Sequence, residues 1–157
     1  MDVEKGANFL RDMSDILDEI GLEHFVGFGT LLGIYRDKQL IPYDKDIDLC
    51  TLDPKGKGKV KKALESGLFA KKGIRAFKGR AFTFERDGIS LDIYFFKRHK
   101  AHIFNCGRYQ FSEQQTPFIE IEFNGKFYKA PNDIERYLEV RYGPKWKTPK
   151  RGAHAQR

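Results

Sequence analysis

Three aspartates at two-residue spacing carry the most specific chemistry in this sequence: Asp44, Asp46 and Asp48. On a β-strand, side chains two residues apart share a face, so the carboxylates of Asp46 and Asp48 would lie together while Ile47 and Leu49 face a core. Two carboxylates about 4 Å apart repel each other by roughly 4 kcal/mol at an effective dielectric constant near 20. A cation between them removes that repulsion, and clustered hard oxygen ligands favour Mg²⁺ or Mn²⁺. The spacing therefore predicts a divalent-metal site.

Two familiar acidic motifs do not fit this stretch. An EF-hand loop that began at Asp44 would need Gly at its sixth position and Glu at its twelfth, where this chain has Leu49 and Lys55. A dinucleotide-binding turn fits better, but the glycines of segment 27–33 have one residue too many before the last of them. The later chain also reads as hairpins instead of alternating strands and helices, which argues against a Rossmann fold.

A nucleotidyltransferase-type site fits the order of the motifs. The Gly29-Thr30 turn follows a first strand, the strand with Asp46 and Asp48 comes next, and Asp92 arrives on a later strand. In residues 89–96 the apolar side chains alternate, so Asp92 points to the face opposite them. Two ions held about 3.5–4 Å apart by such carboxylates can orient a polyphosphate and activate a hydroxyl. In this interpretation Asp46 and Asp48 bridge the ions, and Asp92 completes the site nearest the acceptor.

The elements around the aspartates follow from hydrophobic periodicity. Apolar residues at three- and four-residue steps predict a helix over 3–20, and a buried strand follows at 24–28. Thr30 suits the N-cap of a short helix from Leu31 to Arg36, whose first N–H groups would cradle a phosphate. The aspartates then lead into a strand at 46–51.

The rest of the chain predicts more hairpins than helices. Lysines alternate with glycines over 55–59, which indicates a mobile loop at the entry to a helix that ends near Gly67. On that loop, Lys57 either lies on a solvated face or contacts an anionic substrate. Further strands are expected at 74–78, 80–86 and 89–96, hairpins at 101–111 and 120–129, and a last helix at 131–143. Together these elements predict an α+β fold with a mixed or antiparallel sheet flanked by helices.

Length and composition set the broad class. The 157 residues, 40% of them apolar, suit a single globular domain over 1–157 with a basic tail from about residue 145. The net charge of +7 suggests an anionic partner. No stretch approaches the roughly 20 apolar residues of a membrane span, and the N-terminus does not read as a signal peptide. We therefore expect a cytoplasmic protein, or one peripheral at a membrane surface.

Two segments carry a resemblance to a known family. Gly29-Thr-Leu-Leu-Gly-Ile-Tyr-Arg36 and Ile41-Pro-Tyr-Asp-Lys-Asp-Ile-Asp-Leu49 closely resemble the signature of the LicD family, which includes the fukutin-related proteins. The segment 137–149 is similar to that family's closing Tyr-Gly-x-x-Trp/Met-x-x-Pro element. This sequence has Tyr43 where the family usually has Trp, and it lacks the large insertions of longer members. The resemblance covers about residues 5–150.

The resemblance implies a nucleotidyltransferase-like fold and Mg²⁺-dependent transfer of a substituted phosphate, such as phosphocholine or a polyol phosphate. The donor would be a nucleoside-diphosphate conjugate, typically CDP-linked, and the acceptor a glycan or glycolipid hydroxyl, so nucleic acid is not the expected partner in this interpretation. By position, the acidic site would comprise Asp44, Asp46, Asp48 and Asp92, and the substrate-binding residues would be Gly29, Thr30, Arg36 and Lys57. Asp44 either binds the metal directly, holds a metal-bound water or caps the turn. Arg36 either binds phosphate or fixes the loop through Asp44 or Asp48.

Two other functions remain open at this stage. The same site would also suit transfer of the nucleotide itself to a protein, an RNA or a small molecule, with release of pyrophosphate. A nucleotide- or metal-binding module without catalysis is the third class. The retention of every acidic position argues against the third class, because a carboxylate cluster without a metal is electrostatically costly.

Overall fold

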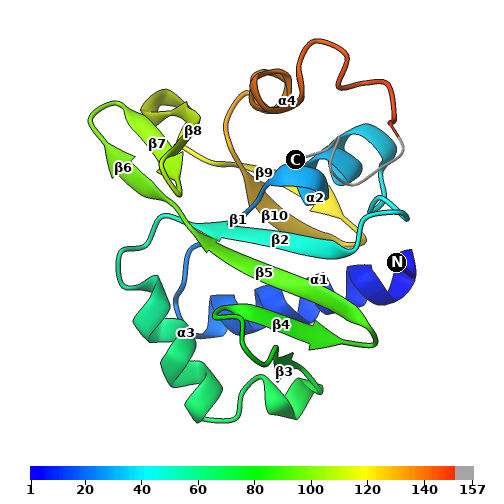
Figure 1. Cartoon of the computed structure of the whole chain (residues 1–157), viewed down its shortest axis with the longest axis vertical. Helices are drawn as coiled ribbons and strands as arrows, with labels where there is room; N and C mark the ends of the chain where they lie inside the picture. Colours follow the sequence, from blue (N-terminus) through cyan, green and yellow to red (C-terminus); the bar gives the residue numbers. More distant parts are fainter. Residues whose placement is uncertain (151–157) are drawn as a thin grey trace.

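The structure is a computed structural model that describes residues 1–150. Its centre is a five-stranded sheet in the order β1-β2-β5-β4-β3 (Figure 1). The strands are β1 (Phe25–Val26), β2 (Asp46–Thr51), β3 (Arg75–Ala76), β4 (Thr83–Arg86) and β5 (Ile89–Phe95). Strands β2 and β5 run parallel, and the other neighbours in this sheet are antiparallel. The predicted α+β class with a mixed sheet flanked by helices is confirmed.

Helices and two smaller sheets surround this centre. The helices are α1 (Val3–Glu19), α2 (Phe28–Leu32), α3 (Gly56–Glu65) and α4 (Ile134–Tyr142), and a π-helical turn over Gly33–Asp37 extends α2. The smaller sheets comprise β6 (Lys97–His99), β7 (His102–Asn105) and β8 (Arg108–Ser112), and β9 (Ile119–Phe123) with β10 (Lys126–Ala130). In Figure 1, α2 and α4 lie at one end of the molecule and α3 with β3 at the other.

The first helix forms where the apolar periodicity predicts it. The carboxylate of Asp2 caps its N-terminus by accepting hydrogen bonds from the backbone N–H groups of Glu4 and Lys5, both at 3.1 Å. Gly21 adopts a positive φ of 71° directly after the helix, a conformation that glycine reaches without steric cost. The apolar face of α1, including Phe9 and Leu17, is fully buried.

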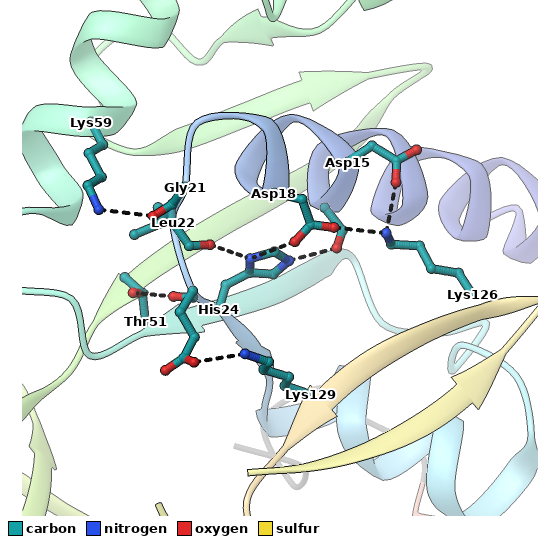
Figure 2. Close-up of polar contacts among 11 residues, drawn as sticks. Asp15, Asp18, Gly21, Leu22, His24, Thr51, Lys59, Lys126 and Lys129 are labelled. Atoms are coloured by element: carbon teal, nitrogen blue, oxygen red, sulfur yellow. Dashed lines mark hydrogen bonds and ion pairs between the residues drawn. The ribbon is translucent and has the colours of Figure 1, made fainter. Parts of the chain in front are cut away.

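Polar contacts fasten α1 to the hairpin of β9 and β10 (Figure 2). Lys126 Nζ donates to Asp15 Oδ1 at 2.8 Å and to Asp18 Oδ2 at 3.1 Å. Beside them, the buried imidazole of His24 lies 2.8 Å from the Leu22 carbonyl through Nδ1 and 2.6 Å from Ser14 Oγ through Nε2. Since the carbonyl can only accept, Nδ1 carries the proton and Nε2 accepts from the serine hydroxyl. Burial lowers the pKa of His24, in keeping with a neutral ring.

Several predicted elements agree closely with the structure. Strand β2 covers the expected 46–51, and its Ile47 and Leu49 are fully buried. The Asn124-Gly125 turn joins β9 to β10 with both residues at positive φ, as a type I′ turn requires. Helix α4 lies within the predicted 131–143. The strands expected at 74–78 and 80–86 also form, but they are shorter, at Arg75–Ala76 and Thr83–Arg86.

Two predictions about the local backbone are wrong. The lysine- and glycine-rich segment that was expected as an entry loop is instead the first part of α3, where a Cβ on Gly56 would come within 3.1 Å of Phe95 and 3.3 Å of Leu22. The strand expected at 24–28 ends at Val26, and α2 begins at Phe28. Among the described residues, no helix has the length and apolar character that crossing a membrane requires. The basic tail expected from about residue 145 lies partly outside the described residues.

Candidate functional site

Three carboxylates from two neighbouring strands converge at the centre of the main sheet. In the parallel pairing of β2 with β5, Asp48 lies directly opposite Asp92, and Asp46 is opposite Ser90. One carboxylate oxygen from each of Asp46, Asp48 and Asp92 lies within 4.8 Å of the other two. The side chains of Asp48 and Asp92 are buried, at 4% and 7% exposure, and Asp46 is half-buried. Alternation along both strands thus produces the cluster that the spacing predicts.

Neighbouring hydroxyl groups hold two of these aspartates in place. Thr83 lies opposite Asp92 on the antiparallel strand β4, and its hydroxyl donates to Asp92 Oδ1 at 2.5 Å. On the other side, Thr30 Oγ1 in α2 accepts the backbone N–H of Asp48 at 2.9 Å. Thr30 is therefore a positioning residue for Asp48, and its contact with a donor phosphate stays a prediction.

Asp44 lies beside the cluster but is not one of the three converging residues. Its carboxylate packs against the backbone of Gly29, where an added Cβ would come within 2.5 Å of Asp44 Oδ2. Asp44 is buried at 8% exposure. Only glycine allows this approach, which explains the first glycine of the Gly29-Thr30 turn in terms of space for a carboxylate. The contact with Gly29 fits the predicted role of Asp44 as a cap of the turn, and the choice among its three roles stays a prediction.

The turn itself differs from the predicted capping arrangement. Gly27, not Thr30, is the N-cap of α2, and it offers no side chain to the first turn. The Phe28 N–H instead donates to the hydroxyl of Tyr137 in α4 at 2.9 Å. Burial raises the pKa of the Tyr137 phenol, so it stays protonated at neutral pH. The thiol of Cys50 is also fully buried there, and a Cβ on Gly27 would meet its sulfur at 2.9 Å.

Arg36 is engaged with the C-terminal segment. Its Nε and Nη2 atoms donate to the two carboxylate oxygens of Asp37 at 2.8 and 2.9 Å, and its Nη1 donates to the Trp146 carbonyl at 3.1 Å. The bond to Asp37 raises the pKa of the guanidinium further. Trp146 is buried and its ring lies 6.0 Å from that of Tyr35. These contacts favour the structural role for Arg36, through Asp37 instead of the predicted Asp44 or Asp48.

A hollow of about 440 Å³ opens on the Asp92 side of the cluster. Lys57 lies at its edge, with Nζ 5.9 Å from the ring centre of Phe82 and 5.6 Å from that of Phe95. Arg80 also lines the hollow. Cations over aromatic faces are held in place while their N–H groups remain available. Lys57 is therefore placed where it can contact a substrate anion, as one of its two predicted roles requires.

A second, smaller hollow of about 110 Å³ lies on the Asp48 side. Its lining includes Phe28, Asp48 and Arg141, and it shares Tyr94 and Asn105 with the larger hollow. Sequence reasoning missed Arg141 and Asn105 as site residues. The segment 137–149, which resembles the family's closing element, includes Arg141 and was the signal that could have drawn attention to the end of α4.

The donor set fits a divalent metal. Three carboxylates supply only hard oxygen ligands, and their oxygens lie close enough together to share an ion. With two of the three side chains buried, a bound divalent cation would offset the repulsion among these carboxylates. Asp46, Asp48 and Asp92 are thus the residues that would hold Mg²⁺ or Mn²⁺.

Comparison with protein families finds a match over most of the chain. The family described as LicD/FKTN/FKRP, nucleotidyltransferase domain, matches residues 21–133. This range includes the Gly29-Thr30 turn, the three converging aspartates, the lysine-rich segment 55–59 and the hairpin of β9 and β10. It ends before Arg141.

Two groups of curated proteins are similar to the chain. One is ribitol-5-phosphate transferase FKTN, 29% identical in Macaca fascicularis over 93% of this chain and 34% of that protein. The other is ribitol 5-phosphate transferase FKRP, 26% identical in Homo sapiens over 85% of this chain and 30% of that protein. The chain therefore spans about a third of the length of these relatives.

Among solved structures, the antibiotic-resistance factor ANT(2'')-Ia is similar in fold. Its solution structure aligns with a TM-score of 0.60 over 99% of this chain and 82% of that one, at 16% sequence identity. A crystal structure of the same factor in complex with adenylyl-2''-tobramycin aligns with a TM-score of 0.54. At this identity the likeness supports the fold alone.

Proposed function

The chain belongs to the LicD/FKTN/FKRP nucleotidyltransferase-domain family, and from this premise we propose that it transfers a polyol phosphate from a CDP-linked donor to a glycan hydroxyl. The observation that carries the proposal is the convergence of Asp46, Asp48 and Asp92 within 4.8 Å of one another. The similar proteins FKTN and FKRP are ribitol-5-phosphate transferases, which favours a polyol phosphate over phosphocholine as the transferred group.

In the proposed reaction, the polyol phosphate moves from the CDP-linked donor to the acceptor hydroxyl in one balanced displacement. The acceptor hydroxyl oxygen attacks the phosphorus that carries the polyol, a new O–P bond forms, and the bond from that phosphorus to the bridging oxygen of the diphosphate breaks. CMP leaves with the bridging oxygen, and the hydroxyl proton passes to a base. When bound, Mg²⁺ or Mn²⁺ would supply Lewis-acid stabilisation of the phosphoryl oxygens.

The protein's own residues position the reactants and accept the proton. Asp92 is the base in this proposal, because its hydrogen bond from Thr83 fixes one oxygen while the carboxylate faces the larger hollow. That hollow, at about 440 Å³, has room for a sugar or polyol unit. Lys57 at its edge would contact a substrate anion, and the Gly29-Thr30 turn would hold a donor phosphate near Asp48.

The decisive experiment is identification of products by mass spectrometry. The protein is incubated with Mg²⁺ and a panel of nucleoside-diphosphate conjugates, with glycan acceptors and with water alone as acceptor. Release of CMP together with a phosphodiester product supports the proposal. Release of pyrophosphate from CTP or ATP with a nucleotide-bearing product would replace it with nucleotide transfer. Nucleotide binding without turnover of any donor would identify a binding module instead.

The matched control is Asp46→Asn, which retains the size of the side chain and removes a charge from the cluster. Products that form equally well with this variant would exclude the carboxylate cluster as their source, and the proposal with it.

A further inference from the structure

Arg141 at the end of α4 lines the small hollow together with Asp48 of the carboxylate cluster, and it lies beyond residues 21–133, which the family model matches. We propose that Arg141 is a phosphate-binding residue, which takes a phosphate of the substrate's diphosphate in the small hollow on the Asp48 side. The inference deepens the proposed function and rests on it for the identity of the substrate. The phosphate-binding role itself can be tested without that identity.

The position of Arg141 is set by a long-range contact. Tyr137 in α4 accepts the N–H of Phe28 in α2, and this bond joins residues 109 positions apart. Residues four apart on a helix share a face, so Arg141 follows Tyr137 onto the face that meets α2. There its guanidinium carbon lies 4.5 Å from the ring centre of Phe28. The contact holds the planar guanidinium over the ring and fixes its orientation.

The side chain has unused hydrogen-bonding capacity. Arg141 Nε is buried and makes no hydrogen bond with any of the residues that the structure describes. A buried donor without a partner is costly and is usually satisfied by a ligand or by water. An arginine offers five N–H donors in a planar fork that matches the oxygens of a phosphate. The open donor therefore indicates an anion as its partner.

The hollow that Arg141 lines has the right size and surroundings for one phosphate group. Its volume of about 110 Å³ is well below the roughly 300 Å³ of the smallest pockets that enclose drug-sized ligands. Tyr94 and Asn105 line both this hollow and the larger one beside Asp92. A diphosphate can thus reach from Arg141 past the carboxylates while the rest of the substrate occupies the larger hollow.

A simpler role for Arg141 would be that of a counter-ion to Asp48, which also lines the small hollow. The two roles differ in what loss of the arginine does to metal binding. A counter-ion competes with the metal for the carboxylate, so its removal would strengthen metal binding. A phosphate ligand leaves metal binding nearly unchanged and contributes only when a phosphate is present.

The test measures binding of pyrophosphate by calorimetry in the presence of Mg²⁺, with Mg²⁺ alone titrated separately. We expect Arg141→Gln to weaken pyrophosphate binding at least about 10-fold, the usual effect of losing hydrogen bonds to a charged group. Mg²⁺ affinity should change less than about 2-fold. Arg136→Gln is the matched control, because Arg136 lies on the same helix, is exposed, and should bind pyrophosphate as the unsubstituted protein does.

The variant Arg141→Lys keeps the experiment decisive if Arg141→Gln does not fold. Lysine retains the charge and loses the fork, so pyrophosphate binding should weaken by a smaller factor, about 3-fold or more. Unchanged pyrophosphate binding in a folded variant, tighter Mg²⁺ binding, or no pyrophosphate binding by the unsubstituted protein would each overturn the assignment. Because pyrophosphate has no base and no polyol, these outcomes are independent of whether a CDP-linked donor is the substrate.

Discussion

The protein contains two groups of three aspartates, and their surroundings differ in a way that separates structure from function. On α1, Asp12, Asp15 and Asp18 lie three residues apart along one face. On β2 and β5, Asp46, Asp48 and Asp92 come together from strands that are adjacent in space and distant in sequence. The helical group lies toward solvent, whereas two members of the strand group are buried.

Each aspartate of α1 meets a cation of the same chain. Arg86 Nη1 donates to Asp12 at 2.7 Å, and Lys126 bonds to both Asp15 and Asp18 (Figure 2). In the strand group, one carboxylate oxygen of each residue lies within 4.8 Å of the other two. Because both groups contain three aspartates, the number of acidic residues alone does not identify a metal site. The burial and convergence of the strand carboxylates are what make that group the candidate metal site.

The first prediction tests the strand group at the residue assigned as base. Asp92→Asn keeps size and shape but removes the charge, and we expect turnover to fall at least about 100-fold, the scale seen when one transition-state-stabilising group is lost. Donor binding, measured by calorimetry, should change far less, because Asp46 and Asp48 remain. With the fold checked by circular dichroism, normal turnover would mean that Asp92 is an ordinary strand residue.

The second prediction compares the two groups directly. A ligand that binds only the native state raises the melting temperature by mass action, by about 2.7 kcal/mol of unfolding free energy at 100 times Kd. We expect Mg²⁺ with CDP to raise the melting temperature of the unsubstituted protein. Asp46→Ala should abolish the increase, and Asp15→Ala on α1 should retain it. Equal increases in both variants would remove the distinction between the groups.

The strand group was more predictable from sequence than the features around it. Alternation over 46–51 and 89–96 has a period of two, so it determined both the strands and the faces of Asp48 and Asp92. The family resemblance placed the two strands side by side, but their parallel register was not predicted, because α3, β3 and β4 separate them in the sequence.

The remaining features depend on contacts that no local pattern contains. The glycines of 55–59 favoured a loop by propensity, but the segment is helical and Gly56 lies close to Phe95, a tertiary contact that propensity does not contain. Arg141 reads as one charge on an amphipathic helix, and it reaches the site only through the contact of Tyr137 with Phe28. The local sequence predicts Thr30 as an N-cap. Its hydroxyl instead accepts the backbone N–H of Asp48, a contact between residues distant in sequence that no local pattern reveals.

The third prediction concerns pH and the histidine beside the α1 group. Burial lowers the pKa of His24 in the folded protein, with Asp18 opposing this shift and Lys126 and Lys129 adding to it. The unfolded chain then binds a proton more readily than the folded one. The free energy of unfolding should fall as pH drops below about 6.5, by at most about 1.4 kcal/mol per pH unit.

Chemical denaturation between pH 5 and 8 measures this slope. His24→Gln should flatten it, and His102→Gln should leave it unchanged because that histidine is exposed on β7. A slope that survives His24→Gln would assign the pH dependence to other groups.

The smallest expected effect belongs to the ion pairs of α1. Lys126→Met removes the bonds to Asp15 and Asp18, whose side chains are 55% and 61% exposed. Exposed ion pairs contribute about 0–1 kcal/mol, and both of these bonds share the single ammonium of Lys126, so we expect the free energy of unfolding to fall by about 1 kcal/mol. Lys129→Met, which removes a more exposed pair with Glu23, should cost no more than that. In both variants the increase in melting temperature with Mg²⁺ and CDP should match that of the unsubstituted protein. If Lys126→Met reduced that increase, the two aspartate groups would be coupled through the hairpin of β9 and β10, and the α1 group could no longer be treated as a purely structural counterpart of the site.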